Sequence, residues 1–206
     1  MPANLRTAVL ALAVVAMPVE AALGDCAADA KTALDARLTA LPLRETIDSL
    51  RDGEHERVLL EIETLKRIHS VIKSVGGGAD AGVDLLILDG KGWSKEHGHW
   101  QPFAAAAATA ESTVEDEQGL ATQLTDGAAV TCLGPVAVDG RQLTGYDLKL
   151  DADPSSSAPY TSMQLYVDPT TGLPHNLDMK GQGEAGPAVT NERFEYPRNF
   201  KLTAPR

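Results

Sequence analysis

Two histidines in the short segment Glu96–His99 are the residues best spaced for metal chemistry. Alternate residues of a strand point to the same side, so His97 and His99 could together chelate Zn²⁺ or Cu²⁺. A protein metal site normally draws further ligands from distant parts of the chain, and the sequence places no other histidine nearby. A solvated hairpin tip between two tryptophans explains the segment better, and we predict no bound metal and no cofactor.

Hydrolytic chemistry would need a particular arrangement of residues, and the sequence contains none of the usual ones. Serine, histidine and aspartate are present, but without a Gly-x-Ser-x-Gly elbow or a His-Glu-x-x-His motif. Glu61 and Glu63 share one face of a predicted strand with Arg57, and we interpret them as solvated charges rather than as a paired acid and base. The sequence therefore favours a protein that is not an enzyme.

The charge of the chain narrows the classes of partner. The 206 residues carry a formal net charge of −11, with aromatic residues at only 4%. Nucleic-acid binding needs clustered lysine and arginine, so the acidity argues against it. The length suits a single domain with a sizeable core.

The amino terminus has the pattern of a signal for export. Arg6 precedes the apolar run Ala8–Val19, which is too short for a membrane span of about 20 residues. Small residues at Val19 and Ala21 fit a cleavage site. We expect residues 1–21 to be a signal peptide, cleaved near Ala21, and the mature chain to be periplasmic.

Cys26 and Cys132 are the only cysteines, and an even count in an oxidising compartment predicts a disulfide. The bridge would join an amino-terminal helix to a mid-chain strand. Asp25 stands where a lipoprotein acylation motif has a small residue, which further favours a disulfide role for Cys26.

Hydrophobic periodicity predicts the elements that position these residues. A helical spacing of leucines covers Ala27–Leu41, and the alanine-rich, acidic segment Ala104–Gln123 is expected to be a second helix. We interpret its acidic stretch Glu111–Glu117 as a solvated helix face, with docking to a basic partner surface as the alternative. Elsewhere the apolar period is two, and turns such as Asp89-Gly90 separate strands. We predict one α+β domain over residues 22–206, with about nine to eleven antiparallel strands. The last of these strands is expected at Phe200–Thr203.

The strand Val83–Leu88 is apolar on both faces, so each face must be covered by a helix, a partner or a ligand. A curved sheet too wide for its own side chains to fill would leave a ligand cavity, whereas tight packing would leave a plain core. Both alternatives stay open at this point. The residues that we expect to line the concave face are Val58, Leu60, Ile62, Leu85, Ile87, Leu148, Leu165 and Val167, with Trp93 and Trp100 near its mouth.

Two predicted hairpins give the chain a family resemblance. Leu165–Pro174, with its Val-Asp turn followed by Gly-Leu-Pro, resembles a late hairpin of the periplasmic LolA/LolB-like proteins. Leu88–Trp93 resembles the Asp-Gly hairpin that precedes the covering helix in the same group. The order of signal, helix, strands, helix and strands is also similar over most of the mature chain.

The resemblance implies an open, strongly curved antiparallel half-barrel with helices over its concave face. It also implies a cavity that holds acyl chains or other lipid, as in carriers of lipids or lipoproteins in the periplasm. We therefore expect a carrier whose partners are a lipid or an acylated lipoprotein and a membrane complex of the envelope. The alternative is a non-enzymatic accessory protein of the cell envelope that has the same fold and a filled core.

Overall fold

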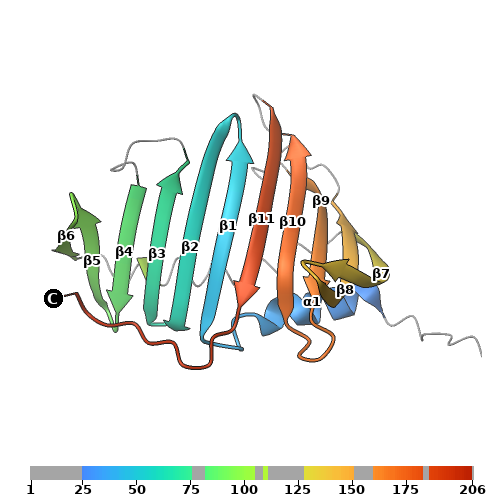
Figure 1. Cartoon of the computed structure of the whole chain (residues 1–206), viewed down its shortest axis with the longest axis horizontal. Coiled ribbons are helices and arrows are strands. Elements are labelled where there is room, and N and C mark those ends of the chain that lie inside the picture. The colour runs from blue at the N-terminus through green and yellow to red at the C-terminus, as the bar shows by residue number, and fades with distance from the viewer. Residues whose placement is uncertain are drawn as a thin grey trace, which may run out of the picture.

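The computed structural model describes residues 25–75, 82–104, 109–110, 128–150, 160–182 and 186–205. These residues contain helix α1 (Cys26–Ala36), two further helical residues at 109 and 110, and eleven strands that form a broad curved wall (Figure 1). The strands are β1 (Leu43–Arg51), β2 (Glu54–Thr64), β3 (Arg67–Ser74), β4 (Gly82–Leu88), β5 (Lys91–Glu96), β6 (His99–Phe103), β7 (Ala129–Val138), β8 (Arg141–Lys149), β9 (Tyr160–Val167), β10 (Pro174–Gln182) and β11 (Pro187–Glu195).

The strands form a single antiparallel sheet in the order β6-β5-β4-β3-β2-β1-β11-β10-β9-β8-β7. The chain runs outward from β1 to β6, and then returns from the opposite edge, so that β11 pairs with β1. The edge strands β6 and β7 do not pair with each other in the described part of the chain, and the sheet stays open. This confirms the predicted open antiparallel sheet and its number of strands.

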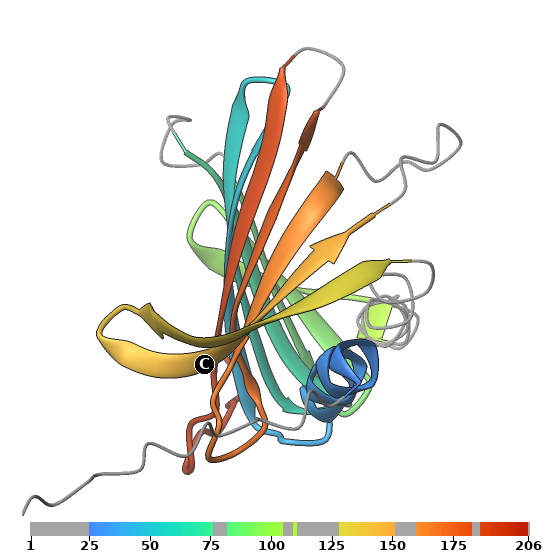
Figure 2. The same cartoon turned by 90° about the vertical axis from the view of Figure 1, so that its right-hand side faces the viewer.

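Helix α1 lies against one side of the twisted sheet (Figure 2). Asp25 caps it, since its carboxylate accepts hydrogen bonds from the amides of Ala27 and Ala28 at 3.1 and 3.2 Å. The helix ends at Ala36, before the predicted end at Leu41, because the amide and the hydroxyl of Thr39 both bond to the Ala36 carbonyl and turn the chain.

The strand alternation divides the sheet into two faces, and we call the one that packs against α1 the inner face. Ala30, Ala33 and Leu34 of the helix belong to one buried cluster with side chains from many strands. The predicted second helix lies largely outside the described residues, although Ala110 is buried in this same cluster. Thus the main core lies between the inner face and the segments that pack on it.

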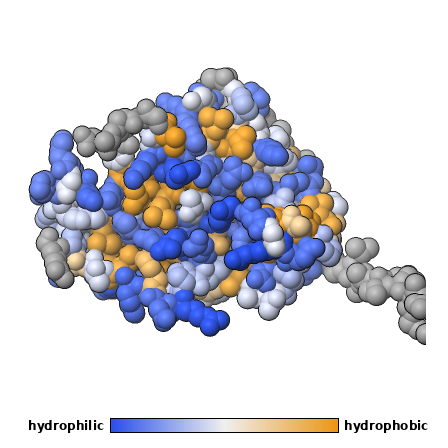
Figure 3. Space-filling view, in the orientation of Figure 1, coloured by the Kyte–Doolittle hydropathy of each residue, from blue (hydrophilic) through white to orange (hydrophobic). Residues whose placement is uncertain are grey.

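The outer face carries a second, smaller apolar cluster. Leu86 and Leu88 of β4 pack there with Leu202, while Ile87 between them belongs to the inner cluster. The prediction that this strand is covered on both faces is confirmed for these three residues. Elsewhere the outer face is mainly hydrophilic, with scattered apolar patches (Figure 3).

The prediction of a final strand at Phe200–Thr203 is wrong. Residues 200–203 form no strand, and the segment instead crosses the outer face of the sheet. Its backbone instead bonds to side chains: Arg67 donates to the Leu202 carbonyl, and the Leu202 amide donates to Glu63 at 2.8 Å. The strand-like pattern of Phe200 and Leu202 reflects packing on the outer cluster.

Candidate functional site

The inner face of the half-barrel is the candidate ligand site, and most of the residues expected to line it lie there. Val58 and Leu85 are half-buried, and the register places them on the same rows as Ile47 and Leu60 respectively. The other aliphatic residues expected at this site are all buried in the inner cluster: Leu60, Ile62, Ile87, Leu148, Leu165 and Val167.

The two tryptophans differ from this expectation. Trp93 pairs with Leu86, and both tryptophans pack in the outer cluster with Leu86, Leu88 and Leu202. Glycine at position 92 faces Ile87 on the inner side instead. Because successive residues of a strand face opposite sides, an error of one residue in the assumed phase places a side chain on the wrong face.

The apolar character of the inner face continues across neighbouring strands. One row of paired residues consists of Leu43, Ile62, Ile68 and Ile87, which come from β1, β2, β3 and β4. Each aliphatic CH₂ of a ligand buried on such a surface would contribute about 0.8 kcal/mol. The inner face is thus aliphatic along this row, and all four side chains are already buried in the inner cluster.

Three charged side chains interrupt this apolar surface. Arg37, directly after α1, is 1% exposed; Glu45 of β1 is 1% exposed and Glu192 of β11 is 6% exposed. One guanidinium nitrogen of Arg37 lies 3.9 Å from a carboxylate oxygen of Glu45, and its guanidinium stacks over the Phe194 ring at 5.6 Å. The sequence analysis missed these residues. Both glutamates occupy strand positions where the alternation predicts an apolar side chain; Glu45, for example, lies between Leu43 and Ile47.

Tyr196 lies beside these charges, where the chain leaves β11. Burial raises the pKa of its hydroxyl above the usual range, while the nearby Arg37 has the opposite, smaller effect. The hydroxyl oxygen is buried and has no hydrogen-bond partner among the described residues. The inner face thus combines a large apolar area with a compact polar spot close to the end of α1.

The segment Glu96–His99 forms the exposed tip of the β5–β6 hairpin. His97 has a positive φ of 49°, as its place in the turn requires, and His99 is the first residue of β6. Within the ranges that the structure describes, no group of three or more potential ligands is placed to hold a metal ion.

The interpretation of Glu61 and Glu63 as solvated charges is wrong. Glu61 accepts hydrogen bonds from Arg44 at 2.9 Å and pairs with His69 at 2.9 Å, whereas Arg57 pairs with Asp48. The Glu63 side chain is 8% exposed and binds Arg67 at 3.0 Å. These pairs lie on the outer face, where they link neighbouring strands and hold the carboxyl-terminal segment against the sheet.

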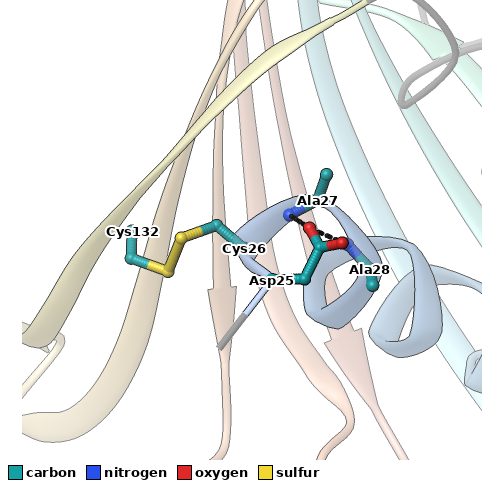
Figure 4. Close-up of a disulfide and its surroundings, with 5 residues drawn as sticks. All are labelled: Asp25, Cys26, Ala27, Ala28 and Cys132. Atoms are coloured by element: carbon teal, nitrogen blue, oxygen red, sulfur yellow. Dashed lines mark hydrogen bonds between the residues drawn. A yellow bond between two sulfur atoms is a disulfide. The ribbon is translucent and has the colours of Figure 1, made fainter. Parts of the chain in front are cut away.

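The predicted disulfide is confirmed, as Cys26 at the start of α1 bonds to Cys132 of β7 (Figure 4). The same view shows the Asp25 cap next to the bridge. The disulfide and the cap together fix the beginning of the helix against an edge strand of the sheet.

A hollow of about 650 Å³ lies near the turns of β7–β8 and β9–β10, at one end of the sheet. Its lining includes charges of both signs, among them Asp139, Arg141, Asp168 and Arg193. Arg193 and Asp139 are paired at 2.7 Å. This polar lining does not match an acyl chain, so the inner face is the better candidate.

Comparison with solved structures identifies the fold. The lipoprotein LppX of Mycobacterium tuberculosis matches with a TM-score of 0.56 at 12% identity, over 87% of this chain and 100% of that chain. LprF of Mycobacterium bovis matches with a TM-score of 0.56 at 11% identity, over 86% of this chain and 97% of that one. The chain therefore shares the fold of these two proteins. The open antiparallel sheet expected from the resemblance is part of this shared fold.

Comparisons at the level of sequence found no relative. No protein-family model and no curated protein matches the chain. Along the described ranges, no helix has the length and apolar character needed to cross a membrane.

Proposed function

We propose that the protein is an exported, non-enzymatic carrier that binds a lipid or the acyl chain of a lipoprotein on the inner face of the half-barrel. The observation that carries this proposal is the apolar inner face, which spans neighbouring strands of a sheet that stays open between β6 and β7. LppX, a lipoprotein of Mycobacterium tuberculosis, has the same fold.

In this proposal, residues 1–21 direct export to the periplasm and are removed near Ala21. Helices cover the inner face. The ligand lies against two groups of aliphatic residues, which are Val58, Leu60, Ile62, Leu85 and Ile87 in one half of the sheet and Leu148, Leu165 and Val167 in the other. Loading or unloading takes place at a membrane complex of the envelope. The tryptophans are left out of the lining because they pack on the outer face.

Native mass spectrometry of the protein, purified from an exporting host, tests for a bound lipid. Uptake of a fluorescent fatty-acid ester then measures binding directly. The change Leu85→Gln, at a half-buried position of the inner face, should weaken uptake severalfold, because it places an amide where acyl methylenes would pack. The matched control Leu65→Gln changes a turn residue that is 39% exposed and should leave uptake unchanged.

A filled core is the competing possibility, in which the protein would be an accessory protein of the envelope. It is favoured by inner side chains such as Leu148, Leu165 and Leu177, each of which has 0% exposure. Absence of both co-purified lipid and ester uptake would contradict the carrier and support this alternative.

A further inference from the structure

His69 lies on the outer face of β3, between one carboxyl group from each neighbouring strand. Its Nδ1 atom is 2.9 Å from a carboxyl oxygen of Glu61 on β2, and its Nε2 atom is 2.9 Å from a carboxyl oxygen of Asp84 on β4. The side chains of His69, Glu61 and Asp84 are 21%, 11% and 23% exposed, so water competes little for these contacts. Both distances are those of hydrogen bonds, and His69 thereby links β2 to β4 across β3.

This geometry determines how many protons the three groups share. A hydrogen bond needs one hydrogen between its two polar atoms, and an ionised carboxylate can only accept. A neutral imidazole has a single N–H group, so it would present a bare nitrogen to one of the two carboxylates. Both contacts are hydrogen bonds only when the three groups hold two protons between them, whether the second proton resides on the imidazole or on a carboxyl group.

The strands around this cluster extend it into a chain of charged groups. The guanidinium of Arg44 on β1 lies 2.8 Å from Glu61, and the ammonium of Lys95 on β5 lies 3.8 Å from Asp84. The uncharged ring of Trp100 on β6 lies 6.4 Å from the imidazole between ring centres. The two bonds of the imidazole therefore connect the edge strands β4–β6 to the central strands of the sheet.

We propose that Glu61, His69 and Asp84 form a pH-dependent link between β2 and β4, which is complete while the cluster holds two protons and loses one bond when the second proton leaves. The folded state favours the cluster with two protons, because only folding brings the three groups together. The contribution to stability is therefore complete near about pH 5 and is lost as the pH rises through the range in which histidine side chains release a proton. This inference is independent of the carrier function.

Urea unfolding at pH values from about 5 to about 9 compares His69→Gln with the unchanged protein, since the glutamine side chain does not titrate. Near pH 5 we expect His69→Gln to raise the unfolding equilibrium constant about tenfold, a difference of about 1.4 kcal/mol. This difference should shrink as the pH rises. The matched control His99→Gln, at an exposed position of β6, should follow the unchanged protein at every pH. A difference of constant size for His69→Gln would show a packing role only and would overturn the proposal.

Asp84→Asn tests the same link and keeps the imidazole. The introduced amide can donate to the bare Nε2 atom of a neutral imidazole, while the Nδ1–H group still donates to Glu61, so both bonds form without the second proton. When His69→Gln is added to Asp84→Asn, its effect on the unfolding equilibrium constant should therefore vary much less with pH than in the unchanged background. An undiminished pH dependence in the Asp84→Asn background would also overturn the proposal.

Discussion

Glu63 shows how a single residue on the outer face holds a distant part of the chain. Its carboxylate accepts hydrogen bonds from the Leu202 amide at 2.8 Å and from Arg67 and Lys201 at 3.0 Å each. The Leu202 amide, followed by the Arg67 guanidinium, lowers the pKa of Glu63 from 4.5 to about 2. The native state therefore favours the ionised carboxylate.

This lowered pKa predicts how stability depends on pH. Above the unfolded pKa of 4.5 the contribution of Glu63 is complete, and it is lost as the pH falls toward about 2. Glu63→Gln should reduce the free energy of unfolding by about 1–3 kcal/mol near neutral pH. In urea unfolding curves, the difference between variant and unchanged protein should shrink as the pH is lowered through this range. A difference that is the same at every pH would contradict the assignment, and Glu54→Gln serves as the control.

At the scale of elements, the carboxyl-terminal segment Phe200–Thr203 lies across the outer face, and we call it the strap. Leu202 is 8% exposed and packs with Leu86 and Leu88, and Trp93, Trp100 and Phe200 surround them. Both tryptophans of the protein belong to this cluster, so their fluorescence reports on how well it is shielded from water.

Leu202→Ala should therefore lower stability by about 2 kcal/mol or more through the cavity that it leaves. It should also shift tryptophan emission to the red, since the strap would exclude less water. Uptake of a lipid ester should be unchanged, because the strap and the inner face lie on opposite sides of the sheet. Leu50→Ala, at an exposed position of β1, is the matched control, and an unshifted emission in Leu202→Ala would refute the strap.

At the scale of the whole molecule, the disulfide connects residues that are 106 positions apart and joins α1 to the edge strand β7. Closing such a long loop limits the unfolded chain, and the chain-entropy model assigns it about 4–5 kcal/mol. The bridge also holds the helix on the inner face of an otherwise open sheet.

The double change Cys26→Ser, Cys132→Ser should lower the midpoint of thermal unfolding markedly, and a reductant should have the same effect on the unchanged protein. The reductant should have no effect on the double variant. Equal melting of the oxidised and reduced forms would show that the bridge contributes little to stability.

The sequence by itself determined that the domain is mainly antiparallel strands and about how many there are, because alternation, Asp-Gly turns and prolines act over a few neighbouring residues. The strand predicted at Val83–Leu88, for example, is observed as β4 at Gly82–Leu88. The paired cysteines and the half-barrel likeness were likewise accessible from the sequence, the first from their even number and the second from two hairpins.

Only the tertiary structure decided which side of each strand faces inward and what covers the other side. A period of two defines two faces but does not say which is the inner one, so Trp93 and Trp100 were assigned to the concave side. The strap and the buried charges of Arg37, Glu45 and Glu192 depend on pairing and packing between residues far apart in the chain. Local patterns carry no information on such contacts, because long-range register alone brings these side chains together.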